Sequence, residues 1–192
     1  MSSPSPIEIH PLSPERQADL LGFFEGPAFA DNPRWRSCYC QFLYVDHRRV
    51  HWPSRSGDEN RAAACARIGA GTMRGLLAYR DGQVVGWCNA APRTLLDAFA
   101  DEPDPDAERL GQITCFVVAP AHRRTGVATA LLDAACAALR HQGMALAEAA
   151  PKPDIAGDAE NHYGPLSMFL AAGFTVHRQG EHGSVLVRKS LV

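Results

Sequence analysis

The sequence predicts a single α/β domain in which strands and helices alternate along the chain. An apolar run at 112–118 is followed by a turn and then by a long helical pattern. Asp81-Gly82 lies between two runs of β-prone residues, which is typical of a hairpin. Taken together, the signals follow the order β-α-α-β-β-β-α-β-α-β-β. With 192 residues and 46% hydrophobic content, the chain can bury one core, so we expect one domain over residues 1–192.

The N-terminal third is expected to hold one strand and two helices. Residues 7–10 form a short β-prone run. Ser13 followed by proline is typical of a helix start, with serine as N-cap, and this helix is expected to extend to about Phe24. Residues 28–57 are rich in aromatics, arginine and histidine and favour no regular element. Residues 58–73 are rich in alanine and predict the second helix.

The middle of the chain predicts a hairpin, a loop, a strand and the longest helix. The hairpin strands are expected at 76–80 and 83–88. Residues 98–111 are acidic and contain prolines, which favours a mobile loop before the strand at 112–118. The helix expected over 129–142 has no internal proline or glycine and carries an apolar stripe at helical spacing, so it should pack on a sheet.

The C-terminal part is expected to complete the sheet. Residues 144–149 predict a strand, and 150–164 a polar loop. Proline at 165 and glycine at 173 suit the start and end of a short helix. Residues 174–178 and 184–189 predict a closing hairpin.

Composition excludes several partners. The formal charge of −2 and the pI of about 6.4 predict no general attraction to nucleic acid or to an anionic membrane. The longest apolar stretch, 128–139, is too short to span a bilayer.

The first residues lack the basic start and apolar core of a secretory signal. The six cysteines lack the spacing of a disulfide framework, so we expect reduced thiols and a cytoplasmic location.

The most informative segment is 116–128, an apolar strand followed by proline, two arginines and a glycine at the start of the long helix. A helix that begins at glycine offers unpaired amide N–H groups and the positive end of its dipole to an anion. Arg123 and Arg124 add positive charge beside it. Neither a Gly-x-x-x-x-Gly-Lys-Ser/Thr run nor a Gly-x-Gly-x-x-Gly pattern occurs here, which argues against a triphosphate or dinucleotide site.

The order Arg123-x-x-Gly126-x-Ala128, after a strand ending in Val118, resembles the acetyl-CoA signature of the GCN5-related N-acetyltransferase (GNAT) superfamily, Gln/Arg-x-x-Gly-x-Gly/Ala. The segment 169–174 resembles the second landmark of the family, in which a tyrosine precedes Gly-Phe by four residues. The resemblance covers nearly the whole chain. It implies the family fold, a mixed sheet of six or seven strands flanked by helices.

The resemblance also implies acetyl-CoA as co-substrate and direct transfer of acetyl to a primary amine. Pantetheine would lie along the strand at 112–118, bonded to the backbone of Phe116 and Val118, with the Val118 N–H facing the acetyl oxygen. The pyrophosphate would lie on the backbone of 123–129. The residues expected to bind CoA are Phe116, Val117, Val118, Arg123, Arg124, Thr125, Gly126, Val127, Ala128, Thr129, Asn161 and Phe169.

The general acid is left open, because the family's tyrosine position is occupied by Phe169, which has no proton to give. Tyr163 and Ser167 are nearby alternatives by resemblance and chemistry. Both could equally be structural, Tyr163 capping a loop and Ser167 bonding a backbone carbonyl. A thiolate with a pKa of about 8.5 is a tolerable leaving group, so water or no acid could suffice.

The general base is open too. Glu25, Glu108, Glu148 and His162 are candidates by chemical type. Glu148 lies in an apolar strand, where burial would raise the pKa of its carboxyl toward a useful range. The alternative is a structural carboxylate paired with an arginine.

Cys38, Cys40, His47 and His51 have the ligand types of a zinc site. However, cysteines separated by one residue depart from the usual spacing, so we expect no metal. The alternative is that these thiols pack with Trp35, Tyr39, Phe42 and Trp52 beside the acceptor cleft. The same place in the superfamily shapes the acceptor pocket, which Trp35, Tyr39 and Trp87 could line.

Two other functions are alternatives to an acetyltransferase activity. The missing tyrosine suggests a non-catalytic acyl-CoA sensor, and the Cys–His segment suggests a zinc-stabilised interaction module. The acceptor itself is open, with small amines and peptides both compatible with the near-neutral charge. Homodimers are common in the superfamily, but no motif in this chain encodes one.

Overall fold

The computed structural model describes residues 5–152, 161–180 and 183–192, and its strands form one seven-stranded sheet in the order β1-β2-β3-β4-β5-β7-β6. Neighbouring strands are antiparallel except for β4 and β5, which are parallel, so the sheet is mixed as expected. The strands are β1 (Glu8–Pro11), β2 (Gly75–Arg80), β3 (Gln83–Pro92), β4 (Leu110–Val118), β5 (Leu146–Ala149), β6 (Thr175–Gln179) and β7 (Val185–Ser190).

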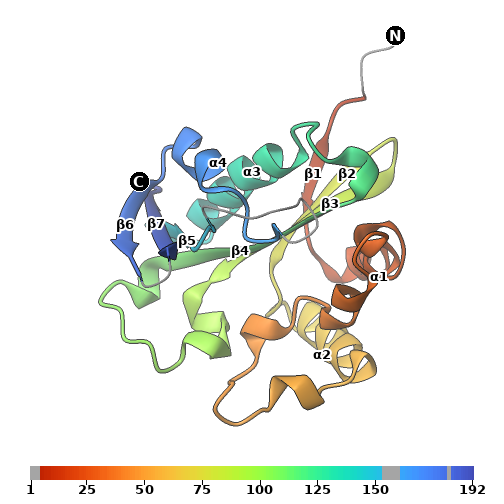
Figure 1. Cartoon of the computed structure of the whole chain (residues 1–192), viewed down its shortest axis with the longest axis horizontal. Coiled ribbons are helices and arrows are strands. Elements are labelled where there is room, and N and C mark those ends of the chain that lie inside the picture. The colour runs from red at the N-terminus through yellow and green to blue at the C-terminus, as the bar shows by residue number, and fades with distance from the viewer. Residues whose placement is uncertain (1–4, 153–160, 181–182) are drawn as a thin grey trace.

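Four α-helices cover the two faces of the sheet, with α3 and α4 on one side and α1 and α2 on the other (Figure 1). They are α1 (Gln17–Glu25), α2 (Gly57–Gly69), α3 (Val127–His141) and α4 (Leu166–Ala171). The fully buried Leu131 and Leu132 of α3 belong to the core of the first side, while Phe24 and Trp87 belong to that of the second. Gly86 of β3 allows α3 to lie close, since a Cβ there would stand 2.7 Å from Val127 Cγ1.

All the predicted strands and helices are present, with shifted ends. β3 continues through Pro92 instead of stopping at 88, because residues 89–92 pair with the first half of β4. Pairing across the sheet outweighs the low strand propensity of Asn89 and Pro92. Residues 28–56 contain short 3-10 turns and no α-helix or strand. The loop predicted at 150–164 and the turn at 179–183 lie partly outside the described residues.

The helix-start prediction at Ser13 is only partly right. Ser13 precedes a 3-10 turn (Pro14–Arg16), its side chain makes no capping bond, and α1 begins at Gln17. The serine that does cap a helix is Ser56, whose hydroxyl accepts from the Glu59 amide at 3.2 Å while the Glu59 carboxylate accepts from the Ser56 amide at 2.7 Å. This reciprocal capping box explains why α2 begins at Gly57.

The parallel strands β4 and β5 pair over only a short distance. Their register runs from Leu110 opposite Leu146 to Gln112 opposite Glu148, and β4 then continues to Val118 without β5 beside it. Thr114 forms a β-bulge against β3, because Ile113 and Cys115 lie opposite the consecutive residues Ala90 and Asn89. The edge of β4 beyond Gln112 is therefore open toward the C-terminal half of the sheet.

A buried ionic network holds the fork between β4 and β5. The Glu148 side chain is 3% exposed, and its carboxylate accepts from Gln112 Nε2 at 2.5 Å and from Arg188 Nε at 2.6 Å. Arg93 approaches the same carboxylate at 3.7 Å. Arg188 also pairs with Asp104 of the loop before β4. The loop predicted at 98–111 thus contains short 3-10 turns anchored to β7, and the strand after it starts at Leu110.

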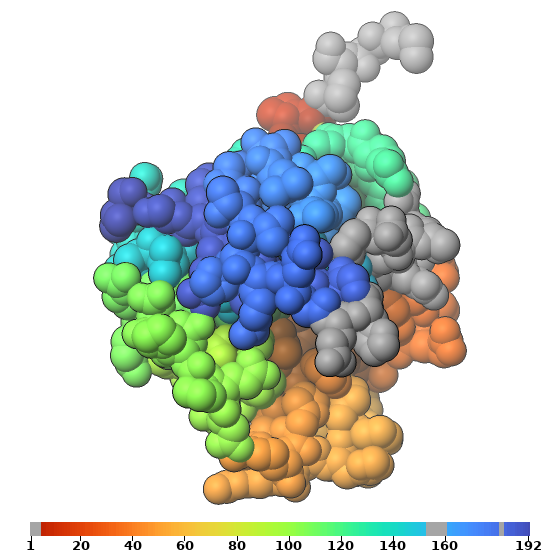
Figure 2. Space-filling model, turned by 60° about the vertical axis from the view of Figure 1, so that its left-hand side comes forward, coloured from red at the N-terminus to blue at the C-terminus, as the bar shows by residue number. Residues whose placement is uncertain are grey.

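The 93–109 segment joins two regions that are distant in sequence. Figure 2 shows it (green) lying between the C-terminal region (blue) and the N-terminal segment before α2 (orange). Arg48 pairs with Asp101 on one side, and Arg188 pairs with Asp104 on the other. No helix among the described residues is both long and apolar enough to cross a membrane.

Substitution of Arg188 by methionine should lower the free energy of unfolding by about 3–5 kcal/mol, because it leaves the Glu148 carboxylate buried without its main partner. Urea denaturation measures this loss. The matched control is Arg109→Met, since the Arg109 side chain is 62% exposed and its acidic partner among the described residues is Asp106. Equal losses in the two variants would show that the buried pair contributes nothing particular to stability.

Candidate functional site

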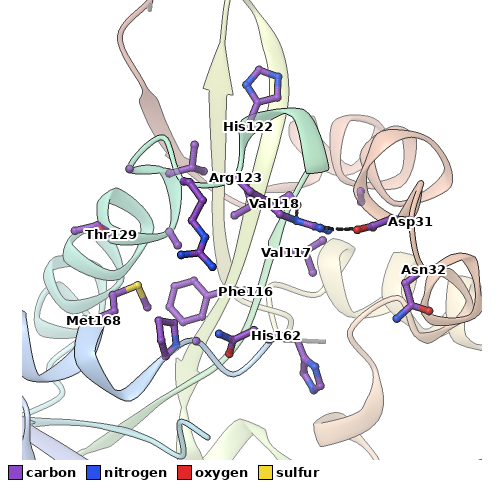
Figure 3. Close-up of a pocket in the computed structure, with 18 of the residues that line it drawn as sticks. Asp31, Asn32, Phe116, Val117, Val118, His122, Arg123, Thr129, His162 and Met168 are labelled. Atoms are coloured by element: carbon purple, nitrogen blue, oxygen red, sulfur yellow. Dashed lines mark hydrogen bonds and ion pairs between the residues drawn. The ribbon is translucent and has the colours of Figure 1, made fainter. Parts of the chain in front are cut away.

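A cavity of about 350 Å³ lies along the open edge of β4 and reaches the start of α3. Figure 3 shows Phe116 of β4 on the same side of the strand as Thr129 of α3 and Met168 of α4, whereas Val117 lies on the side of Asp31 and Asn32. The remaining walls come from the segment 161–165 and from the segment 28–35. The cavity therefore forms where the shortened pairing of β4 and β5 leaves room beside the strand.

The turn before α3 brings backbone amides to this cavity. Arg124 and Gly126 both adopt left-handed backbone angles, with φ of 59° and 86°. Gly126 is the N-cap of α3, and no side chain caps the helix. A Cβ at Gly126 would have no atom within 4 Å, so the space beside the turn is open. The amides of the first turn, together with the helix dipole, have the chemistry to attract an anion.

Arg123 is engaged within the protein. Its guanidinium pairs with Asp31 through contacts of 2.5 and 3.0 Å, and its Nε donates to the Val118 carbonyl at 3.1 Å (Figure 3). Hydrogen bonding from Arg123 and its positive charge hold the pKa of Asp31 below its usual value, against a smaller effect of burial. The arginine predicted to meet a phosphate therefore also ties the segment 28–35 to the turn before α3.

The backbone of β4 presents alternate residues to its open edge. Ala119, just beyond the strand, donates its amide to Val85 of β3 at 3.0 Å. Because N–H and C=O directions alternate along a strand, Val118 and Phe116 direct their amides away from β3. The Phe116 amide is already used, since it donates to the His162 carbonyl at 2.7 Å. The Phe116 N–H is therefore engaged within the protein, so a backbone bond from Phe116 to pantetheine would use its carbonyl, whereas the Val118 N–H faces the open edge.

Most of the residues predicted to bind CoA do lie around one cavity. Those that line it are Phe116, Val117, Val118, Arg123, Arg124, Gly126, Val127, Ala128, Thr129 and Asn161. The Asn161 Oδ1 atom is buried and has no hydrogen-bond partner among the described residues. The side chain of Thr125 is held elsewhere, donating to the His122 carbonyl at 2.7 Å and accepting from Arg80 at 3.0 Å.

Phe169 is a second exception. It is fully buried, packs against Phe116 and Phe174, and lines neither this cavity nor the next. Its prediction as a CoA-binding residue is therefore not matched by its position in the core. Of the two candidate general acids, Ser167 lines the first cavity and Tyr163 lines the second. Burial raises the pKa of Tyr163, which keeps its hydroxyl protonated and able to donate.

The structure separates the four candidate bases. Glu25 accepts from Arg61 at 2.8 Å and from the Tyr39 hydroxyl at 3.1 Å, and Glu108 lies exposed in a 3-10 turn. Neither lines either cavity. Glu148 has the alternative role considered above, a structural carboxylate paired with Arg188. His162 is the candidate that lines both cavities.

A second cavity of about 440 Å³ adjoins the first on the side of α1 and α2. The two cavities share Phe29, Trp35, Val117 and His162 in their walls. The ring of Trp35 meets that of His162 edge-on at 4.5 Å between centroids. A group bound along β4 and a second molecule in the adjoining cavity would thus come closest to each other beside these shared residues. The sequence gives no signal for Phe29 and Asp31, since loop residues without periodicity reveal their neighbours only in the fold.

The aromatic and cysteine residues near this cavity are divided between wall and core. Trp35 lines the second cavity as expected, but Trp87 is fully buried and Tyr39 is 8% exposed, and neither lines it. Cys40 accepts from Trp87 Nε1 at 3.2 Å. Burial raises the pKa of Cys38 to about 11, which disfavours the thiolate that a metal needs.

His47 of the Cys–His segment packs among aromatic side chains. His47 bonds the Phe42 carbonyl at 2.8 Å, and its ring packs against Phe42 and Trp52. Within the part of the chain that the structure describes, no three histidine, cysteine or acidic side chains converge as metal ligands do. The packing of His47 on Phe42 and Trp52 agrees with the aromatic packing considered above for this segment.

Residues 35–155 match the model of the acetyltransferase (GNAT) family. The structure resembles an N-acetyltransferase from Staphylococcus aureus Mu50, with a TM-score of 0.60, 13% identity, and coverage of 98% of this chain and 100% of that chain. It also resembles YncA, a putative acetyltransferase from Salmonella typhimurium solved with acetyl-CoA, with a TM-score of 0.57, 15% identity, and coverage of 97% and 94%.

A third similar structure is the PaiA N-acetyltransferase from Thermoplasma acidophilum in complex with coenzyme A, with a TM-score of 0.55 and 16% identity over 96% of this chain and 99% of that one. At these identities the likeness shows the fold. The sequence matches none of the curated proteins.

Replacing Asp31 by asparagine should tighten binding of inorganic pyrophosphate to the first cavity by about fivefold, because Arg123 loses its internal counter-charge, an effect of about 1 kcal/mol at a partly exposed pair. Calorimetry measures the affinity. Asp46→Asn is the control, since Asp46 pairs with Arg48 and lines neither cavity. Weaker binding in Asp31→Asn would mean that Asp31 positions Arg123 for the anion instead of competing with it.

Proposed function

Because the chain belongs to the acetyltransferase (GNAT) family, we propose that it transfers the acetyl group of acetyl-CoA directly to a primary amine. The observation that carries the proposal is the open edge of β4, which leads from the uncapped start of α3 to the wall shared by the two cavities. This arrangement can hold a long anionic thioester on one side and an amine on the other.

The residues of the first cavity fit the parts of CoA. The first-turn amides of α3 and the guanidinium of Arg124 suit a pyrophosphate, and the open space beside Gly126 allows its oxygens to approach the backbone. Asn161 Oδ1 has no donor among the described residues, and a pantetheine amide N–H would supply one. When bound, the thioester supplies an activated acyl carbon.

In the reaction that we propose, the amine nitrogen attacks the thioester carbon, the C–S bond breaks and the thiolate of CoA leaves. The Val118 N–H faces the open edge and would donate to the oxyanion that develops at the carbonyl. His162, at the shared wall, would accept the proton of the ammonium directly or through water. Ser167 in the first cavity and Tyr163 in the second are the side chains that could protonate the leaving sulfur. Since acetyl-CoA is the donor, we propose a cytoplasmic enzyme.

Gly126→Val should weaken acetyl-CoA binding by at least tenfold, because the side chain would enter the space beside the helix start and the backbone would leave its left-handed angle. Gly143→Val is the control. It has nearly the same backbone angle, with φ of 84° against 86°, and equally open surroundings, but lies beyond the other end of α3.

Thermal melting of both variants separates strain from binding, and calorimetry measures affinity. If valine prevents folding, the same comparison is made with alanine. Equal affinity in the two variants would remove the helix start from the acetyl-CoA site.

Release of CoA thiol with a panel of amines tests whether the protein is an enzyme. We expect turnover with at least one primary amine, and His162→Ala should lower kcat about a hundredfold, a typical contribution of a general base. Acetyl-CoA binding without thiol release for any amine would favour the acyl-CoA sensor.

A further inference from the structure

The second cavity has walls suited to a flat apolar group. Phe42 and Trp52 meet edge-on at 5.2 Å between ring centroids, and Phe29 and Trp35 line the side nearest the first cavity. Aromatic rings pack favourably edge-on or offset against one another, so these side chains can enclose a further ring. The volume of about 440 Å³ lies within the range of small-molecule sites.

The charges around this cavity are of one sign. Arg34 and Arg55 line it, whereas no aspartate or glutamate among the described residues does. Arg55 is held in place by Asn60 Oδ1, which accepts from its Nε at 2.7 Å. A polyamine or a lysine side chain would find no carboxylate in these walls, while a ligand carboxylate would find two guanidinium groups. Nearby positive charge also favours the neutral form of an amine, which is the form that attacks a thioester.

A polar side chain in the same cavity lacks a partner. Thr114 is 7% exposed at the β-bulge of β4, and its hydroxyl has no hydrogen-bond partner among the described residues. It lines the second cavity beside Asn89. The Asn89 Oδ1 already accepts from the Tyr44 hydroxyl at 3.2 Å, and its Nδ2 donates to Cys40 Sγ at 3.8 Å. Buried hydroxyls are normally paired, so an orphaned one in a cavity wall points to a ligand atom.

From these three features we propose that the second cavity is the acceptor site and that it selects a small aromatic amine bearing a carboxylate, such as an aromatic amino acid. The proposal rests on the acetyl-transfer function proposed above and specifies its substrate class. The ring would lie among Trp35, Phe42 and Trp52, the carboxylate at Arg34 and Arg55, and a polar atom at Thr114. The amine would then reach the wall shared with the first cavity, next to Val117 and His162.

Four amines that differ in the presence of an aromatic ring and a carboxylate test the substrate class. Phenylalanine has ring and carboxylate, phenethylamine lacks the carboxylate, alanine lacks the ring, and spermidine is a polycation that lacks both. We expect kcat/KM for phenylalanine to exceed that of each of the others at least tenfold. Preferred acetylation of spermidine or phenethylamine would overturn the substrate class while leaving acetyl transfer intact.

If no amine is acetylated, calorimetry can still measure whether phenylalanine binds to the second cavity. With the CoA-saturated protein we expect phenylalanine to bind with a Kd below about 1 mM, a value typical of substrates, and no detectable binding would overturn the proposal. Binding without thiol release would instead reject the enzymatic function and retain the site.

Variants then assign the roles of single side chains. Arg34→Gln should raise KM for phenylalanine at least fivefold and leave KM for acetyl-CoA unchanged. Its control is Arg36→Gln, in the same 3-10 turn (Pro33–Cys38) but lining neither cavity. Equal effects of the two variants would contradict a specific carboxylate contact.

Thr114→Val tests the acceptor site independently, because valine has the same shape as threonine but lacks the hydroxyl. We expect a KM for phenylalanine raised about threefold or more together with an unchanged or higher Tm, since an unpaired buried hydroxyl is removed. An unchanged KM would exclude Thr114 from the acceptor site, and a lower Tm would show that the hydroxyl is satisfied within the protein.

Discussion

The parting of β4 from β5 is the constraint on which the site depends. The two parallel strands pair from Leu110 to Gln112 only, and the rest of β4 has an open edge. A carboxylate buried at the fork, Glu148, is held by Gln112 and Arg188, and Arg188 also reaches the loop before β4. Burying such an ion pair costs desolvation free energy, so it adds little to stability. It does, however, fix the place where the two strands separate. Without that parting, β5 would cover the Val118 amide and no cavity would lead to the start of α3.

The two cavities on either side of this edge share a positive character but differ in its source. In the first, the charge comes from helix-start amides and from arginines of the turn, one of which is paired with Asp31. In the second, it comes from side chains of the segment between α1 and α2, with aromatic rings between them. Arg123 and Asp31 join the two regions, since Asp31 belongs to the segment that continues into the wall of the second cavity. Occupation of one cavity is therefore expected to affect the other.

Local patterns in the sequence predict much of this structure. Asp81-Gly82 predicts its hairpin, and the strand, turn and glycine at 116–128 predict the strand–turn–helix unit and most of the residues around the first cavity, because those features depend on neighbours in sequence. Contacts between residues that are far apart in the sequence could not be predicted in this way. Asp31 meets Arg123 from 92 residues away, and the carbonyl that occupies the Phe116 amide belongs to His162. Phe169 illustrates the same limit, since a position read from a family landmark as facing CoA is filled by a core side chain.

The central claim is that main-chain amides at the end of β4 and the start of α3 hold acetyl-CoA. An amide-resolved NMR titration with acetyl-CoA measures this directly. We expect the largest shift changes at the amides of Val118, Val127, Ala128 and Thr129, with little change at Phe116, whose N–H already donates to His162. Shift changes concentrated away from these amides, or their absence at saturating acetyl-CoA, would contradict the assignment.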